Sequence, residues 1–218
     1  MSTTLPASRQ KLVGGFLFFC LVAIGAALIW RTFGEQVAVE RTETKPIPPQ
    51  QTPEGNVLAV FGEAPRFSLT ERSGKTFTKG DLRARPWIAN FIFTSCAGQC
   101  PLMSLQMRKL QGLFPADTGF RFVSFTVDPE RDTPEVLTQY ADRYEAEGDR
   151  WFFLTGPKEE INRILNGFFL SPVDQPAMHS IRFILVDGEG QMRGYYDSSD
   201  SGAMNQLIHD AKILLRTK

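Results

Sequence analysis

The chain has few of the residues that staple small extracellular folds or bind metal clusters: its 218 residues include three cysteines and two histidines. Three cysteines are too few for a disulfide-stapled mini-domain, so any cysteine chemistry must be local. Neither sign of charge is in excess, because the chain has 24 basic and 24 acidic residues. This balance argues against a nucleic-acid partner, since nucleic-acid-binding modules usually carry a basic excess. The hydrophobic fraction of 42% is ample for a core and excludes a wholly disordered chain.

Charge is missing altogether from one stretch near the amino terminus, Leu12–Trp30 (LVGGFLFFCLVAIGAALIW). As a helix it would extend about 28 Å, close to the ~30 Å hydrocarbon core of a bilayer. Arg9 and Lys11 precede it and no acid does, so we expect residues 1–11 in the cytoplasm and the rest of the chain outside it.

We therefore predict a single-pass transmembrane anchor, residues 12–30, in the inner (cytoplasmic) membrane, or in the mitochondrial inner membrane if the source is eukaryotic. The lipid bilayer is then a partner of this segment. A cleaved signal peptide is the alternative, although its apolar core is usually shorter, at about 7–15 residues. Cys20 lies inside the span and is interpreted as a packing residue.

A spacer separates this segment from the remaining chain. Residues 31–56 include Glu40–Asn56 (ERTETKPIPPQQTPEGN), which has four prolines and almost no apolar side chain. Such a composition predicts an extended, semi-rigid linker. Residues 57–218 have the length of a single domain. We expect this domain to work near the membrane surface.

Within residues 57–218, patterns typical of strands alternate with patterns typical of helices. Apolar and β-branched runs predict strands, and turn residues join four of them into two hairpins. Thr133-Pro134-Glu135 is typical of a helix start, with threonine as N-cap and proline in the first turn. The predicted strands are Phe67–Leu69, Thr76–Thr78, Trp87–Phe93, Phe120–Val127, Trp151–Leu154, Ile181–Val186 and Gln191–Tyr196, and the predicted helices begin near Gly98–Cys100 and at Thr133, and run over Glu159–Phe168 and Gly202–Leu215.

This order of elements predicts an α/β domain with a parallel central sheet, helices on both faces and an antiparallel edge from the late hairpin. A thioredoxin-like fold has this order, with reactive cysteines where its first core strand meets the next helix. Cys96 and Cys100 stand at that junction. We therefore predict a thioredoxin-like fold with an N-terminal hairpin extension, preceded by a single transmembrane helix.

The two cysteines form a motif with a proline, FTSCAGQCP over Phe93–Pro101. Proline is tolerated in the first turn of a helix but not in its interior, so the helix should begin near Gly98–Cys100. Cys96 then lies in the approaching loop and Cys100 in the first turn. Unpaired N–H groups and the positive end of the helix dipole favour thiolate over thiol, so we expect both sulfurs to ionise readily.

Spacing limits what this pair can do. Residues four apart in near-helical backbone have Cβ atoms about 5–6 Å apart, whereas a disulfide needs about 3.5–4.5 Å. A metal held by two sulfurs bridges the wider gap, so the spacing favours a metal without forbidding a disulfide. Thiolates suit Cu(I) and zinc, but structural zinc normally has four protein ligands and residues 57–218 hold no other cysteine. A structural disulfide stays open as an alternative, although closing so short a loop removes little chain entropy.

The two histidines differ in their promise as ligands. His209 stands within the last predicted helix, and we assign it no role. His179 stands just before the predicted strand Ile181–Val186, and in a thioredoxin-like sheet the loop entering this strand faces the active-site helix. Cys96, Cys100 and His179 would form a set of two sulfurs and one nitrogen that can hold Cu(I) and accommodate Cu(II). Met178 is interpreted as a packing residue rather than an axial ligand.

An acidic loop, DPERDTPE, follows the second core strand and so falls at the carboxyl edge of the sheet, where α/β sites cluster. Much of it has a plain structural interpretation, since Thr133-Pro134 is a helix start and Asp128-Pro129 ends a strand. Asp128 and Asp132 are also candidates to orient His179 or the cysteine loop by hydrogen bonding, without binding the metal themselves.

These motifs, in this order, resemble the Sco/SenC family of membrane-anchored copper proteins. The matching residues are Cys96-x-x-x-Cys100-Pro101, Asp128-Pro129-x-x-Asp132-Thr133-Pro134-Glu135, and His179-Ser180 leading into Leu185-Val186-Asp187-x-x-Gly190. The resemblance covers roughly residues 57–216, and a preceding anchor also fits. One position departs from the family: members often have Pro-Asp after the first cysteine, where this chain has Ala97-Gly98. A more flexible loop there could change copper retention or thiol redox poise.

The resemblance implies a copper metallochaperone with Cys96, Cys100 and His179 as ligands, working in maturation of the binuclear copper centre of cytochrome c oxidase. Its partners would be a copper donor protein and an apo-subunit of the oxidase or another copper acceptor. An alternative stays open, a membrane-anchored thiol–disulfide oxidoreductase whose catalytic pair, Cys96 and Cys100, reduces cysteines of an apo-metalloprotein. Whether the protein is an enzyme depends on this choice. We reject a peroxidase of the peroxiredoxin type, because Phe93 stands where its threonine would be.

Overall fold

The computed structural model describes residues 58–169 and 181–216 of the chain. The predicted anchor, the linker and His179 lie outside these ranges. Among the helices within them, none is long and apolar enough to cross a bilayer.

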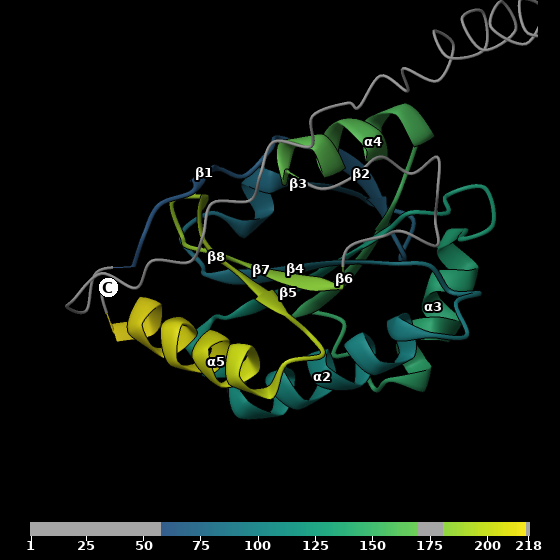
Figure 1. The fold of residues 1–218 in the computed structure, drawn as a ribbon. Helices are drawn as coiled ribbons and strands as arrows, with labels where there is room; N and C mark the ends of the chain where they lie inside the picture. Colours follow the sequence, from purple (N-terminus) through teal and green to yellow (C-terminus); the bar gives the residue numbers. More distant parts are fainter. Residues whose placement is uncertain (1–57, 170–180, 217–218) are drawn as a thin grey trace, which may run out of the picture. The chain divides into compact units, whose positions relative to one another are not determined.

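The described residues form an eight-stranded mixed sheet with the strand order β1-β8-β7-β4-β5-β6-β2-β3 (Figure 1). β4, β5 and β6 run parallel to one another, β7 pairs antiparallel with β4, and β2 pairs antiparallel with β6. The core strands therefore point their carboxyl ends at one edge of the sheet. The strands are β1 (Gly62–Glu63), β2 (Ser68–Glu71), β3 (Thr76–Thr78), β4 (Trp87–Ile92), β5 (Arg121–Thr126), β6 (Trp151–Thr155), β7 (Arg182–Val186) and β8 (Gln191–Asp197).

Helices cover both faces of this sheet, as Figure 1 shows with α4 on one side and α2 and α5 on the other. The helices are α2 (Gln99–Leu113), α3 (Pro134–Arg143), α4 (Lys158–Gly167) and α5 (Ser201–Arg216), with short 3-10 turns η1 (Lys79–Leu82) and η2 (Ala116–Thr118). Thr133 caps α3, its hydroxyl accepting from the Val136 N–H at 3.4 Å, with Pro134 at the first helical position.

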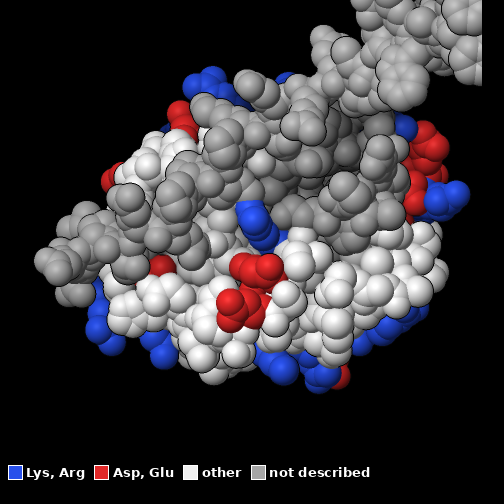
Figure 2. All heavy atoms as spheres, viewed as in Figure 1, with Lys and Arg blue, Asp and Glu red and all other residues white. Residues whose placement is uncertain are grey.

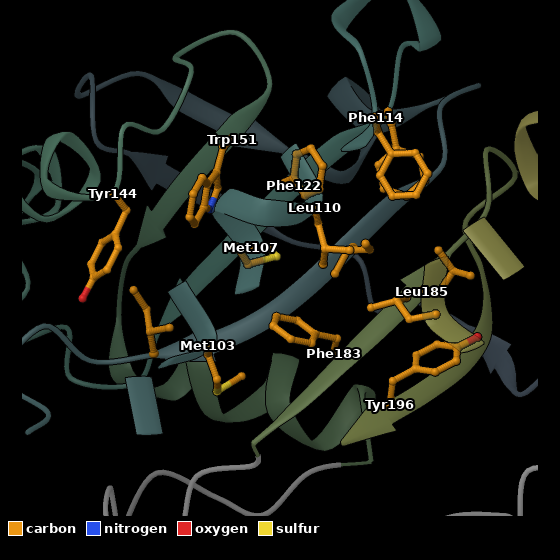
Figure 3. Packing of buried hydrophobic residues seen from close by; sticks show 14 of the residues in the cluster. Met103, Met107, Leu110, Phe114, Phe122, Tyr144, Trp151, Phe183, Leu185 and Tyr196 are labelled. Carbon is orange, nitrogen blue, oxygen red and sulfur yellow. The ribbon is translucent and has the colours of Figure 1, made fainter. Parts of the chain in front are cut away.

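Strand alternation divides the interior into two cores. On β4, Ile88 and Ile92 face the core under α2, α3 and α5, whereas Ala89 and Phe91 face the core under α4. This is the period of two that strand geometry requires. In Figure 3 the α2 side chains Met103, Met107 and Leu110 lie over Phe183 and Leu185 of β7; all five are buried.

The predicted strands and helices are confirmed, with ends that differ by one or two residues. The two hairpins are β2–β3, which turns at Gly74 with a φ of +80°, and β7–β8. β1, η1 and η2 were not predicted, because they are too short to show a period. The late hairpin was predicted to form the edge of the sheet, but β1 pairs outside β8 and forms that edge.

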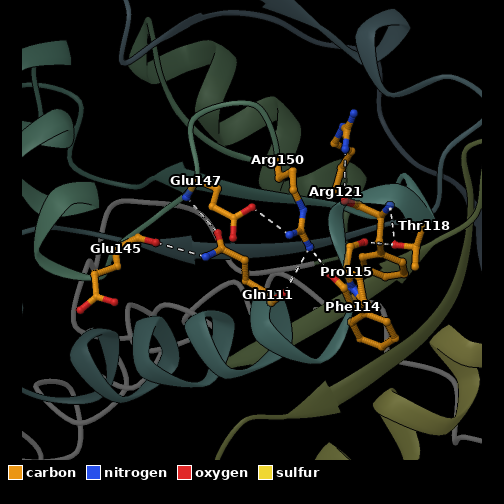
Figure 4. Close-up of polar contacts among 9 residues, drawn as sticks. Gln111, Phe114, Pro115, Thr118, Arg121, Glu145, Glu147 and Arg150 are labelled. Carbon is orange, nitrogen blue, oxygen red and sulfur yellow. Dashed lines mark hydrogen bonds and ion pairs between the residues drawn. The ribbon is translucent and has the colours of Figure 1, made fainter.

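Arg150 closes the far end of α2 and was not predicted. Its guanidinium, 3% exposed, donates to the carbonyl of Gln111 at 3.1 Å and to that of Phe114, and it pairs with Glu147 at 2.8 Å (Figure 4). The last carbonyls of a helix have no partner within it, and a cation there also complements the dipole. Arg150 therefore fixes where α2 ends, and so helps to fix the helix that carries Cys100.

We expect Arg150→Met to lower the free energy of unfolding by about 3 kcal/mol, because it leaves buried helix carbonyls without a donor. Urea denaturation of the parent and variant chains measures this difference. Arg143→Met is the matched control, since Arg143 is exposed on α3 and a change there should cost less than about 0.5 kcal/mol. Equal stability of the two variants would contradict the role of Arg150.

Candidate functional site

The cysteine motif lies where β4 ends and α2 begins, as the position of Pro101 predicts. Cys96 is in the loop, Gly98 is the N-cap of α2, and Cys100 and Pro101 are in the first turn. Gly98 has no side chain to cap the helix, so the first N–H groups are open to another acceptor. The Cys96 sulfur takes that place, accepting from the Gly98 N–H at 3.4 Å.

The two sulfurs differ sharply in environment. Cys96 is partly exposed, whereas Cys100 is fully buried against the core under α2. Burial opposes ionisation of Cys96, but N–H groups of Cys100, Gly98 and Gln99 and the Cys100 thiol hydrogen-bond to its sulfur and lower its pKa below the usual value. Cys96 is thus the natural thiolate of the pair.

The expectation that both sulfurs ionise readily is wrong for Cys100. Burial raises the pKa of Cys100 to about 12, and the neighbouring Cys96 sulfur and the Asp132 carboxylate add to the rise. The helix N-terminus does not compensate, because the desolvation of a buried anion outweighs it. The structure describes no bond between the two sulfurs.

Asp132 lies at the base of the cysteine loop and is completely buried. One carboxylate oxygen accepts from the Thr94 hydroxyl at 2.5 Å, and the other accepts from the Thr94 N–H at 3.1 Å and from the Thr126 hydroxyl. Burial raises the pKa of Asp132, while these hydrogen bonds oppose the rise. The carboxylate therefore ties the segment that follows β4 to the end of β5.

Asp128 lies in the same acidic loop but points elsewhere. Its carboxylate pairs with Arg131 at 3.0 Å, and its carbonyl accepts from the Asp132 N–H at 2.9 Å. The Asp128 N–H donates to the Thr126 hydroxyl at 3.0 Å. It supports the loop that carries Asp132.

His179 and Met178 lie outside the described residues, so their relation to the cysteines stays a prediction. Within residues 58–169 and 181–216, no group of three or more histidine, cysteine or acidic side chains could hold a metal ion. Ile181, where the described chain resumes, packs against the same core cluster as Cys96 and Cys100. His209 is exposed on α5.

The surface beside Cys96 is uncharged. No charged residue occurs from Trp87 to Met107, and Leu102 and Leu105 on α2 are 56% and 43% exposed. Among the described residues that Figure 2 leaves visible, a white, uncharged area lies at the lower right, with basic and acidic groups at its margins. The described residues beside Cys96 thus form an uncharged surface with two exposed leucines.

Two residues of this region, Thr94 and Thr126, were not predicted from the sequence. Both lie at carboxyl ends of core strands, where polar side chains gather in α/β folds. Their hydroxyl groups beside a buried acid were the available signal, but only the fold brings Thr94 within hydrogen-bonding distance of Asp132.

A cysteine pair at the N-terminus of the helix that follows the first core strand defines a thioredoxin-like thiol protein. Comparison with known proteins identifies its family. The family described as SCO1/SenC matches residues 60–215. A SCO1 protein homolog of Bacillus subtilis is 32% identical over 157 residues, covering 69% of this chain and 81% of the relative. The chain therefore belongs to the SCO1/SenC family.

Two further similarities refine this assignment. A protein of Stutzerimonas stutzeri, named for proposed copper binding, is 33% identical over 153 residues, covering 65% of this chain and 74% of the relative. The solved structure of BsSco, described as a Sco-family cytochrome c oxidase assembly protein with a disulfide switch, is 30% identical. It covers 75% of this chain and 100% of its own, with a TM-score of 0.67. The predicted thioredoxin-like Sco fold is confirmed.

We expect iodoacetamide to alkylate Cys96 at pH 8 at least about tenfold faster than Cys100, because only the thiolate reacts. The rate at Cys96 should rise with pH and reach half its limit at a lower pH than for an ordinary thiol, since its pKa is lowered, whereas Cys100 stays largely a thiol until about pH 12. Peptide mass spectrometry of the native chain separates these residues from Cys20.

Urea-unfolded chain is the control, and there the two cysteines should react at similar rates. Faster modification of Cys100 than of Cys96 in the native chain would contradict the assigned asymmetry.

Proposed function

We propose that this chain is a membrane-anchored copper chaperone that binds Cu(I) or Cu(II) through Cys96, Cys100 and His179. It would carry copper to an apo-subunit of cytochrome c oxidase, or to another copper acceptor, after receiving it from a donor protein. The observation that carries the proposal is the pair of sulfurs at the open N-terminus of α2, one of them already favoured as thiolate.

The two sulfurs suit a soft cation that is to be handed on. Thiolates select Cu(I) among the common metals. Cys96 offers an ionised, partly exposed sulfur, and Cys100 must lose its proton to bind, so copper affinity should rise with pH. Two protein sulfurs and one imidazole leave the ion open to an incoming ligand, which is what transfer by ligand exchange requires.

Support for His179 is topological. β7 pairs antiparallel with β4, with Trp87 opposite Val186 and Ala89 opposite Ile184. Because the two strands run antiparallel, β7 begins toward the carboxyl end of β4, the end that leads to Cys96. His179 precedes β7 by three residues, and three extended residues span at most about 10 Å. We therefore expect the His179 imidazole to come within reach of the Cys96 sulfur.

The family supports the choice of cargo and acceptor. The Stutzerimonas stutzeri relative is named for copper, and BsSco is described as a cytochrome c oxidase assembly protein. Residues 12–30 would anchor the chain in the inner membrane, or in the mitochondrial inner membrane of a eukaryote, with residues 31–56 as the spacer. The domain of residues 57–218 would then meet its acceptor on the extracytoplasmic side.

Copper titration of the full chain in detergent tests the ligand set. We expect about one copper per chain, and with Cu(II) a thiolate-to-metal charge-transfer band. His179→Ala should weaken this band strongly, because it removes the only nitrogen ligand of the proposed set. His209→Ala is the matched control and should leave the band unchanged.

An unchanged band in His179→Ala, with copper still bound, would exclude His179 from the site. Absence of copper binding by the parent chain at neutral pH would exclude the chaperone proposal itself.

A second function, thiol–disulfide oxidoreductase, is favoured by the asymmetry of the pair and by the disulfide switch named for BsSco. Cys96 as thiolate would attack a partner disulfide sulfur, displacing the partner thiolate, and Cys100 would then attack the mixed disulfide and release the reduced partner. The two electrons come from the two cysteines, which end as a disulfide.

Reduction of a disulfide substrate in the absence of copper separates the two functions. An oxidoreductase should keep its rate in His179→Ala and lose it in Cys96→Ser by at least about a hundredfold, because the attacking thiolate is gone. If the parent chain reduces the substrate no faster than Cys96→Ser does, this function is ruled out.

A further inference from the structure

The outer side of α2 carries a row of exposed leucines. Among the described residues, three of the four large hydrophobic side chains that are exposed lie on this helix, Leu102, Leu105 and Leu113, at 56%, 43% and 53%. Together with Lys109 they follow one another at spacings of three and four residues, so they form one stripe along the helix. The buried side chains of α2 pack into the core on its other side. An exposed apolar row of this kind is typical of a surface that contacts a partner.

The charge on the outer sides of α2 and α5 is basic. α2 has no acidic residue, and the one acid of α5, Asp210, is buried and accepts from the Tyr196 hydroxyl at 2.7 Å. Lys109 on α2 and Lys212 and Arg216 on α5 are exposed and pair with no acid among the described residues. In Figure 2 basic groups and few acidic ones line the lower margin, on the side where Figure 1 places α2 and α5. The balanced charge of the whole chain therefore includes a local basic excess.

The two helices present these groups in the same direction. α2 and α5 lie on one face of the sheet (Figure 1) and bury their inner sides in the same core, so their outer sides both point away from the sheet. We call this surface the α2–α5 face; it comprises Leu102, Leu105, Lys109, Leu113, Lys212 and Arg216. Leu58, the first described residue, packs in the same core, and its carbonyl accepts from Arg193 at 3.0 Å. The chain that leads back to the predicted anchor therefore joins the domain on the α2–α5 side of the sheet.

We propose that the α2–α5 face docks on the surface of a bilayer with anionic headgroups. Leucines beside lysine and arginine are the composition of helices that lie in a membrane interface, and basic residues near an anionic leaflet are attracted to it. The inference rests on the anchor of the proposed function but not on copper. Residues 31–57 span roughly 90 Å at most when extended. Such a tether keeps the domain at a high local concentration beside the bilayer, so even a weak contact is populated.

Docking on this face also sets where the cysteine motif lies. Cys96 precedes the first residue of α2, Gln99, by three positions. A helix with its side chains is about 10–12 Å across, so the Cys96 sulfur lies about one helix diameter from the headgroups when α2 rests on them. The site then meets an acceptor at the membrane surface, and the motion of the tether no longer decides its orientation.

Photo-crosslinking of the copper-free full chain in lipid nanodiscs tests the contact. Benzoylphenylalanine placed at Leu105 or, independently, at Leu113 captures the molecules beside the outer side of α2. The matched control position is Asn166, which is exposed on α4 over the other face of the sheet. In discs containing phosphatidylglycerol we expect at least about fivefold more lipid adduct at Leu105 and Leu113 than at Asn166. Mass spectrometry of the irradiated chain measures these adducts.

A matched pair of triple variants tests the basic residues. One neutralises the unpaired charges of the α2–α5 face, Lys109→Gln/Lys212→Gln/Arg216→Gln. The other removes the same charge from exposed positions elsewhere, Lys75→Gln/Arg83→Gln/Lys158→Gln. The first should lower the adduct yield at Leu105 at least about threefold, because the attraction to the headgroups is lost, whereas the second should leave the yield unchanged. Exchange of phosphatidylglycerol for phosphatidylcholine should act like the first variant.

The inference is overturned if adducts at Leu105 and Leu113 are no more frequent than at Asn166, if phosphatidylcholine supports them equally, or if they join a second chain instead of lipid. A chain that does not enter the disc would defeat the proposed anchor. The same adducts are then sought with vesicles of phosphatidylglycerol, where their absence would defeat docking as well. A chain that docks but binds no copper would defeat the proposed function alone.

Discussion

One hydrogen-bonding requirement organises this site: the first turn of α2 has N–H groups that its own helix cannot satisfy. Gly98 at the N-cap has no side chain to offer, and Pro101 prevents the helix from starting earlier. The Cys96 sulfur accepts from these groups and is favoured as thiolate. The same helix start turns Cys100 into the core, where it is held as a thiol. The difference between the sulfurs thus follows from where one helix begins.

The rest of the fold keeps that helix start in place. Methionine and leucine side chains of α2 pack on β7 and the central strands, and Arg150 binds the carbonyls at its other end. Asp132 joins the loop before Cys96 to the end of β5. A site built this way can offer a soft ligand at the surface while its supporting groups remain buried, which suits both copper transfer and thiol exchange.

Much of this could be predicted from the sequence. The runs Trp87–Phe93 and Phe120–Val127, the cap at Thr133 and the proline of the cysteine motif each carry local information, and the structure confirms the elements they predict. The burial of Cys100, the Thr94–Asp132 bonds and the contacts of Arg150 with the end of α2 were not predicted, because they depend on residues between 36 and 39 positions apart or on packing around a fully buried sulfur. No local pattern encodes such pairings. The Asp132 candidate came from its place after a core strand rather than from any partner.

The central claim is that two sulfurs and one imidazole meet on a single copper ion. X-ray absorption spectroscopy of the copper-loaded full chain tests it most directly, because it reports the atoms bound to the metal. The account predicts about two sulfur neighbours and one imidazole nitrogen, with the imidazole signal lost in His179→Ala. A copper environment without sulfur, or one whose imidazole signal survives that substitution, would contradict it.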